Sequence, residues 1–269
     1  MTKSLESQSV DRINAGLDLA AAILSSFSPG KFRVQYKNGH DPVTEADRAV
    51  NDVLKEFLVR EGEGWFSEET TDDLSRLTKK RLWVVDPLDG TREFVEGIPE
   101  WCCSIALVEN GEAIAGGICN PSTNETIVGS RNTGVSYNGK PATVSGREHL
   151  AGALVLASRS EVKRGEWKRF SDAPINVRGV GSVAYKLGLV AAGQADTTWT
   201  LVPKHEWDVA AGTALVQAAG GTVRMLDGMP VTFNKKDTLL SGLIACTSEL
   251  YEEITSFLNL PLAERAALT

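Results

Sequence analysis

One segment of fourteen residues, 84–97, constrains the fold of this chain more than any other. It begins with an apolar run typical of a buried strand, continues with Asp86 and Asp89, three residues apart, and then places a Gly-Thr pair at 90–91 that can open a helix. In open α/β sheets, ligands bind where strands end. Two carboxylates on one turn attract a hard cation, and backbone N–H groups at a helix start favour phosphate. The segment therefore predicts a strand, turn and helix that bring metal and phosphate together.

The composition is that of an ordinary globular protein. The chain has 269 residues, enough for one large core or for two tightly joined halves. A net charge of −7 without a Lys/Arg-rich block argues against a nucleic-acid polymer as partner. The acidity does not exclude an anionic substrate, because bound divalent cations invert the local field. No apolar run reaches the roughly 18 residues of a membrane span, and the N-terminal apolar stretch lacks the layout of a signal peptide. We therefore expect a cytoplasmic protein that does not bind membranes.

The cysteines and histidines do not favour thiolate or imidazole chemistry. The four cysteines form no CxxC pair, and we interpret them as buried, reduced thiols. Three histidines are too few to favour a histidine-built zinc site.

Periodicity and turn signals divide the chain into two halves of different character. Predicted helices occupy about residues 8–27, 44–58, 182–192, 206–219 and 248–258. Predicted strands lie near residues 32–36, 65–67, 82–85, 104–108, 113–118, 154–157, 196–200, 222–225 and 243–246. Asn-Gly pairs at 110–111 and 138–139 predict hairpin turns. We predict an α+β half over residues 1–148 and an α/β half over residues 149–269, closely packed because no low-complexity linker separates them.

Three further acids stand at the ends of predicted elements. Asp47 and Asp208 lie in the first turns of helices, at the edge of the buried face, and Glu68 follows a short apolar strand. Each has a simple structural interpretation, as a helix-capping carboxylate or a solvated acid. A carboxylate beside the core still needs a partner, and a metal ion would supply one. Together with the two aspartates of segment 84–97, these acids suggest a single site.

Four motifs, in this order along the chain, resemble those of the inositol monophosphatase superfamily. Residues 86–91 (Asp-Pro-Leu-Asp-Gly-Thr) resemble its first signature, and residues 207–212 (Trp-Asp-Val-Ala-Ala-Gly) resemble its second. Residues 41–47 and 67–69 match its two remaining acidic elements, so the resemblance covers about residues 10–257. It implies a layered αβαβα sandwich, a homodimer and a Mg²⁺-dependent phosphatase.

The resemblance also implies a role for each motif residue. Two or three Mg²⁺ ions would be held by Glu68, Asp86, the Leu88 carbonyl, Asp89 and Asp208. Thr91, polarised by Asp47, would act with Glu68 to orient and deprotonate a water molecule, and the amides of Gly90 and Thr91 would hold phosphate oxygens. The reaction would be hydrolysis of the phosphate monoester of a small metabolite without a covalent intermediate.

The motifs constrain the substrate less than the reaction. In an ungapped count, Leu201 stands where animal inositol monophosphatases carry a glutamate that contacts inositol, which weakens an inositol assignment. Arg92 after the motif threonine and the Ser-Arg-Ser sequence at 158–160 resemble bacterial 3'(2'),5'-bisphosphate nucleotidases. We therefore predict a nucleotidase that converts 3'-phosphoadenosine 5'-phosphate to AMP. An inositol monophosphatase, or a related sugar or histidinol phosphatase, is the alternative. Predicted substrate contacts are Arg92, Arg159, Lys204 and His205.

Two interpretations from other functional classes stay open. The Gly-x-Gly-x-x-Ala sequence at 179–184 fits a dinucleotide-binding pattern, although a helix start is the simpler interpretation because Asp196 opens the next strand instead of closing it. The other is an inactive family member that acts as a binding or regulatory subunit. The presence of all the metal-site acids argues against it.

Overall fold

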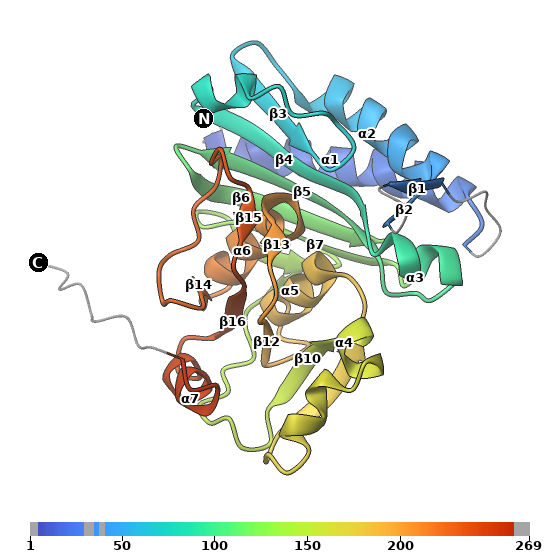
Figure 1. Ribbon diagram of the computed structural model, residues 1–269. Helices are drawn as coiled ribbons and strands as arrows, with labels where there is room; N and C mark the ends of the chain where they lie inside the picture. The colour runs from blue at the N-terminus through green and yellow to red at the C-terminus, as the bar shows by residue number, and fades with distance from the viewer. Residues whose placement is uncertain (1–4, 30–34, 38–40, 261–269) are drawn as a thin grey trace, which may run out of the picture.

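Five layers of helix and sheet are stacked in the protein (Figure 1). The computed structural model describes residues 5–29, 35–37 and 41–260. The first layer consists of α1 (Leu5–Ser26) and α2 (Glu45–Leu58), which pack against one face of a seven-stranded sheet. The layers alternate helix and sheet, so the predicted αβαβα sandwich is confirmed.

The seven-stranded sheet forms the second layer and has the order β3-β4-β5-β6-β7-β8-β9. Its strands are β3 (Glu63–Ser67), β4 (Arg81–Asp89), β5 (Cys102–Glu109), β6 (Glu112–Asn120), β7 (Glu125–Ser130), β8 (Gly134–Tyr137) and β9 (Lys140–Ala142). All neighbours are antiparallel except β3 and β4. The two predicted Asn-Gly turns close the β5–β6 and β8–β9 hairpins, with positive φ at both residues of each turn.

The third and fourth layers come from the C-terminal part of the chain. A mixed sheet of five strands has the order β11-β10-β12-β16-β14. These strands are β10 (Leu154–Ser158), β11 (Asn176–Val180), β12 (Thr197–Thr200), β14 (Gly221–Met225) and β16 (Leu243–Thr247). Between the two sheets lie α5 (Val183–Ala191) and α6 (Glu206–Ala218), whose buried side chains join one core with strands of both sheets.

The fifth layer covers the outer face of the second sheet. It is formed by α7 (Tyr251–Phe257) and the 3₁₀ turn η2 (Glu166–Phe170), which pack around Trp199. The remaining short elements are β1 (Gln35–Lys37), β2 (Asp41–Val43), η1 (Ser75–Thr78), α3 (Thr91–Glu96), α4 (Arg159–Lys163), β13 (Lys204–His205) and β15 (Leu239–Leu240). β1 pairs with β2, and β13 pairs with β15.

The predicted division at residue 148 falls between the two sheets. The first sheet ends at Ala142 and the second begins at Leu154. However, α5 and α6 belong to the C-terminal half and pack against strands of the first sheet. One core therefore spans both halves, and the division stays a prediction.

The strand that leads into the acidic segment is longer than predicted. Asp86 and Asp89 lie inside β4 and not in a loop after it. The register against β5 is irregular between them, because three residues of β4 advance while β5 advances by two. Pro87, which has no N–H to donate, lies within this irregularity. The two carboxylates are thus held on a distorted strand end rather than on a flexible turn.

Other boundaries differ in smaller ways. Val53 and Phe57 are apolar residues of α2 that are 36% and 40% exposed, because α1 and the sheet cover only the stripe of residues 46, 50, 54 and 58. The last helix is α7, shorter than the predicted 248–258. Of the strand predicted near residues 32–36, residues 35 and 36 belong to β1, and residues 32–34 lie outside the described residues.

Two expectations drawn from composition can be compared with the structure. All four cysteines are buried and free, as predicted. Within the described ranges, none of the helices is long and apolar enough to cross a bilayer.

Candidate metal and phosphate site

Three aspartates from two different elements converge where the first sheet meets the middle helices. Asp86 and Asp89 come from β4 and Asp208 from the first turn of α6, and each offers a carboxylate oxygen within 4.8 Å of the other two. Burial, followed by the charges of Glu68, Asp89 and Asp208, raises the pKa of Asp86 well above its usual range. Burial, followed by Asp89 and Glu68, likewise raises the pKa of Asp208 to about 8. Such close carboxylates repel one another unless protons or a cation lie between them.

The donor set fits the predicted magnesium. Every group in the cluster is an oxygen ligand, and Leu88 lines the same cavity as the carboxylates. Hard oxygen donors select Mg²⁺ over softer metals, and a divalent cation among them would remove the repulsion. The residues present therefore fit Mg²⁺, while the number of ions stays a prediction.

Local hydrogen bonds orient the carboxylates of this cluster. Asp86 Oδ1 accepts from the N–H of Leu88 at 3.0 Å, and Asp208 Oδ2 accepts from the N–H of His205 at 3.0 Å, just before α6 begins. In each aspartate one oxygen is therefore occupied by a neighbouring backbone group, which restricts the rotation of the side chain.

Asp89 ties the end of β4 to the start of α5. Its Oδ2 accepts from Ser182 Oγ at 2.7 Å and from the Ala184 N–H at 2.6 Å. Ser182 is also the N-cap of α5, since its hydroxyl accepts from the N–H of Tyr185 at 2.9 Å. The Gly-x-Gly-x-x-Ala sequence at 179–184 is thus the end of β11 and the start of α5, as the simpler interpretation predicted.

Asp47 and Thr91 face each other across the starts of α2 and α3. Thr91 Oγ1 lies 3.3 Å from Asp47 Oδ1 and 3.0 Å from the Leu88 carbonyl oxygen. The second oxygen of Asp47 caps α2, because it accepts from Thr44 Oγ1 at 2.6 Å and from the Thr44 N–H at 2.8 Å. Burial raises the pKa of Asp47 to about 6. The predicted helix cap is confirmed, and the same carboxylate is also in reach of Thr91.

Gly90 makes the start of α3 possible. Its φ of 95° lies in the left-handed region, and a Cβ at this position would lie 3.0 Å from the Glu100 carbonyl oxygen and 3.1 Å from Trp101 Cα. Only glycine satisfies both constraints. The sharp turn brings the N-terminal end of α3 against the cluster.

A cavity of about 300 Å³ joins these groups. The predicted site residues that line it are Glu68, Asp86, Leu88, Asp89, Gly90, Thr91, Arg92, Lys204 and Asp208. Asp47 reaches the cavity only through Thr91.

Two predicted substrate contacts lie outside the residues that line the cavity. Arg159 donates from Nε to Glu100 Oε2 at 2.8 Å, and His205 stacks on Trp207 with ring centroids 4.4 Å apart. Their part in substrate binding stays a prediction.

A model of the inositol monophosphatase family matches residues 6–259. This chain belongs to the inositol monophosphatase family. An inositol-1-monophosphatase from Mesorhizobium japonicum is 33% identical over 243 residues, which cover 87% of this chain and 88% of the relative. The family comprises metal-dependent phosphatases, in agreement with the acidic cluster.

Solved structures of the inositol monophosphatase family share the fold. An inositol monophosphatase from Anabaena aligns with a TM-score of 0.77 and 26% identity, covering 95% of this chain and 97% of that one. CysQ from Bacteroides thetaiotaomicron, a bacterial member of the family, aligns with a TM-score of 0.73 and 26% identity over 90% and 97% of the two chains. The layered arrangement is therefore that of the family.

The sequence analysis missed two charged residues that line the cavity of this family member, Lys186 and Glu93. Lys186 lies on α5, is 5% exposed, and lines the cavity. A buried lysine is rare unless it has a partner. The signal available in the sequence was a single lysine within the apolar helix at 183–191.

Proposed function

We propose that this family member is a Mg²⁺-dependent phosphomonoesterase that hydrolyses a small phosphorylated metabolite with an activated water molecule. The observation that carries this function is the convergence of Asp86, Asp89 and Asp208, together with Thr91, on one cavity. Bound there, Mg²⁺ would neutralise charge on the phosphate and lower the pKa of a water molecule.

The chain's own residues would bind and orient the reactants. The single Thr91 proton can go to Asp47 Oδ1 or to the Leu88 carbonyl, and in both cases the Thr91 oxygen keeps lone pairs that accept from a water molecule. Glu68, which lines the same cavity, would take the proton of that water. The N–H groups of Gly90 and Thr91 at the start of α3 would hold phosphate oxygens.

Among phosphate esters, the substrate we favour is a 3'(2'),5'-bisphosphate nucleotide, namely 3'-phosphoadenosine 5'-phosphate. Arg92 and Lys204 both line the cavity and offer positive charge for a strongly anionic substrate. Leu201 packs with the core on the outer face of the second sheet and has no polar group for an inositol hydroxyl. An inositol monophosphate is the second candidate, favoured by the name of the Mesorhizobium japonicum relative. By resemblance to the family, the enzyme would be a cytoplasmic homodimer.

Release of inorganic phosphate from a panel of esters tests this function. The panel contains 3'-phosphoadenosine 5'-phosphate, inositol 1-phosphate and histidinol phosphate, each with Mg²⁺ and with EDTA. We expect Mg²⁺-dependent release, fastest from the bisphosphate.

Asp86→Asn should abolish turnover and keep the far-UV circular dichroism of the wild type, since a neutral side chain relieves repulsion within the cluster. Full activity of Asp86→Asn would contradict the mechanism. A folded wild type inactive on every ester would favour a binding subunit instead.

A further inference from the structure

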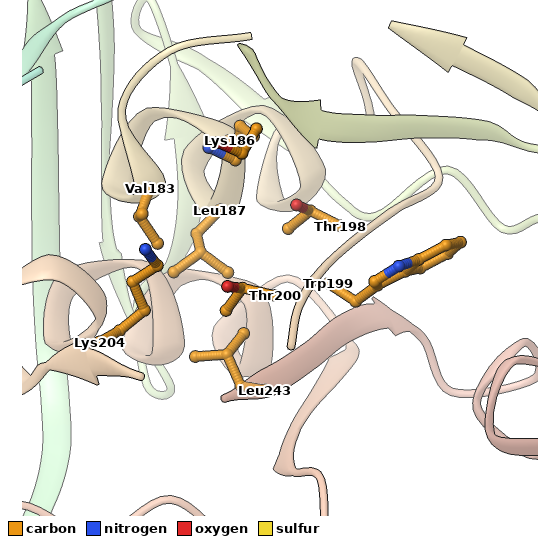
Figure 2. Close-up of a pocket in the computed structure, with 9 residues that line it drawn as sticks. Val183, Lys186, Leu187, Thr198, Trp199, Thr200, Lys204 and Leu243 are labelled. Atoms are coloured by element: carbon orange, nitrogen blue, oxygen red, sulfur yellow. The ribbon is translucent and has the colours of Figure 1, made fainter. Parts of the chain in front are cut away.

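The charged side chains of the cavity are held by elements of different kinds. Lys186 lies within α5, a helix of nine residues whose geometry sets the direction of its side chains (Figure 2). Glu68, which we predict as a metal ligand and as the base, lies directly after β3, in the turn formed by residues 67–70. A turn has few hydrogen bonds of its own, so the direction of the Glu68 side chain depends on what holds this turn.

Two backbone hydrogen bonds define turn 67–70. The N–H of Thr70 donates to the Ser67 carbonyl oxygen at 3.2 Å, which places Glu68 and Glu69 at the centre of the turn. The N–H of Glu68 donates to the Val85 carbonyl oxygen at 3.4 Å, where the pairing of β3 with β4 ends. Both bonds are long for an N–H donor, so the backbone alone holds the turn weakly.

The side chain of Asn51, in α2, holds both ends of the turn. Its Oδ1 accepts from Ser67 Oγ at 2.8 Å and from Thr70 Oγ1 at 3.2 Å. Its Nδ2 donates to Asp52 Oδ1 at 3.1 Å, and because an ionised carboxylate can only accept, the amide is oriented with its oxygen toward the turn. Asn51 is 5% exposed and Ser67 is 1% exposed, so these hydrogen bonds have little competition from water.

The two hydroxyl groups of the turn depend on the Asn51 oxygen as their acceptor. Ser67 Oγ also accepts from the Glu69 N–H at 3.3 Å. Thr70 Oγ1 also accepts from Trp65 Nε1 at 3.0 Å. Each hydroxyl has a single proton, and since its other partner is an N–H donor, that proton goes to Asn51. Loss of the Asn51 oxygen would leave both protons without this acceptor, and the turn would have to move to find another.

The same helix also contacts Thr91, the residue expected to orient the water molecule. Asp47 stands four residues before Asn51 on α2, which is one helical turn or about 6 Å along the axis. Its Oδ1 lies 3.3 Å from Thr91 Oγ1. One face of α2 therefore contacts both Thr91 and the turn that carries Glu68.

We propose that Asn51 is a positioning residue that aligns Glu68 with Thr91 for activation of the water molecule. This role rests on the proposed function, in which Thr91 orients the water and Glu68 takes its proton. Asn51 is not among the described residues that line the cavity, so it acts only through turn 67–70. A displacement of a reacting group by about 1 Å is enough to reduce turnover strongly, and outer partners of a metal ligand also affect metal affinity.

Asn51→Leu tests the alignment, because leucine has a branched side chain of similar shape without an acceptor. We expect kcat to fall about ten- to a hundred-fold on the ester that the wild type hydrolyses fastest, with a change in KM of less than about three-fold. Calorimetric titration with Mg²⁺ in the absence of substrate should show about tenfold weaker binding. Thermal unfolding verifies that the variant is folded.

Thr70→Val and Thr70→Ser form a matched pair at the other end of the same hydrogen bond. Valine has the shape of threonine without the hydroxyl, whereas serine keeps the hydroxyl. Thr70→Val should lower kcat and Mg²⁺ affinity in the same direction as Asn51→Leu, and Thr70→Ser should keep both near the wild-type values. The double variant Asn51→Leu/Thr70→Val should lose less than the product of the two single losses, because both changes remove one shared interaction.

The outcomes separate the positioning role from the proposed function. A folded Asn51→Leu protein with wild-type kcat and Mg²⁺ affinity, or equal losses in Thr70→Val and Thr70→Ser, would overturn the role of Asn51. If Asn51→Leu does not fold, the Thr70 pair decides, because Thr70 is only partly buried. A wild type that releases no phosphate from any ester, but whose Mg²⁺ binding weakens in Thr70→Val and not in Thr70→Ser, would support the positioning of Glu68 and contradict the proposed function.

Discussion

At the scale of single residues, the aspartates of this site each divide their two carboxylate oxygens between structure and chemistry. In Asp47, Asp89 and Asp208 one oxygen accepts hydrogen bonds at the start of a helix. In Asp47 the second oxygen lies in reach of Thr91, and Asp89 and Asp208 each also offer a carboxylate oxygen to the cluster. Helix capping and participation in the site are therefore compatible interpretations of the same acids.

The division of roles in Asp47 leads to a specific expectation. Asparagine at position 47 can still accept from the Thr44 N–H and cap α2, but it has no negative charge to attract the Thr91 proton. We expect Asp47→Asn to lower kcat about a hundred-fold with little change in KM. Steady-state kinetics and thermal unfolding measure the two effects separately.

Thr44→Ser is the matched control, since it keeps the hydroxyl that bonds to Asp47. It should leave kcat near the wild-type value. An Asp47→Asn enzyme with undiminished kcat would exclude a polarising role for this carboxylate.

At the scale of elements, a stack of side chains fixes the end of β3 relative to the start of α6. The guanidinium of Arg76, in η1, lies 4.2 Å from the Phe66 ring centroid, and Phe66 packs against Trp207 with ring centroids 5.0 Å apart. Phe66 is two residues from Glu68, and Trp207 is adjacent to Asp208. The stack therefore sets the separation of two predicted metal ligands that come from different layers.

Arg76 is the residue through which this arrangement can be tested. It is 1% exposed and donates to Asp72 Oδ2 at 2.8 and 3.0 Å, to Asn234 Oδ1 at 2.9 Å and to the Lys235 carbonyl oxygen at 2.9 Å. Lysine cannot reproduce this planar fork. We expect Arg76→Lys to raise several-fold the Mg²⁺ concentration that gives half-maximal activity.

Arg12 of α1, which contacts the other end of β3, provides a matched control. It pairs with Glu63, the first residue of β3, at 2.7 Å, and its guanidinium lies 4.8 Å from the Trp83 ring centroid. Its contacts are therefore of the same kind as those of Arg76, but they lie at the end of β3 that is far from Glu68. Arg12→Lys should destabilise the fold without changing the Mg²⁺ requirement. An equal shift of the Mg²⁺ requirement in both variants would indicate that the fold as a whole has loosened, rather than that Arg76 positions the metal ligands.

Local signals predicted the elements better than they predicted the contacts between them. The Asn-Gly hairpins, the cap at Thr44 and the helix start at Ser182 depend on residues a few positions apart, and the structure has all of them. By contrast, Arg159 meets Glu100 across 59 residues, and Arg76 meets Asn234 across 158. Such pairs depend on how the layers pack, which no local pattern encodes. The same limit explains why Lys186 was missed.

At the scale of the whole molecule, the acidic cluster joins separate layers of the sandwich. Asp86 and Asp89 belong to the seven-stranded sheet, whereas Asp208 starts a helix of the middle layer. Cations bound among them would therefore crosslink the two layers. Ligands that bind only the folded state stabilise it, so Mg²⁺ should raise the melting temperature of this protein.

The acidic cluster should also make the stability of the metal-free protein depend on pH. The pKa of Asp208 is about 8 in the folded protein, against an ordinary 3.8, because of burial and then of Asp89 and Glu68. Between these values the folded protein keeps a proton that the unfolded chain has lost. Stability from this group is therefore greatest at low pH and is lost as the pH rises toward about 8. In EDTA, the melting temperature should fall between about pH 6 and pH 8.

Saturating Mg²⁺ should reduce that fall, because the cation takes the place of the proton between the carboxylates. Asp208→Asn should lose most of both effects, the pH dependence in EDTA and the gain in melting temperature with Mg²⁺, since it removes the titrating group and a predicted ligand together. If the EDTA-treated wild type melted at a constant temperature across this range, the carboxylates could not be strongly coupled. In that case a group other than a metal ion would have to balance the carboxylates that β4 and α6 bring together.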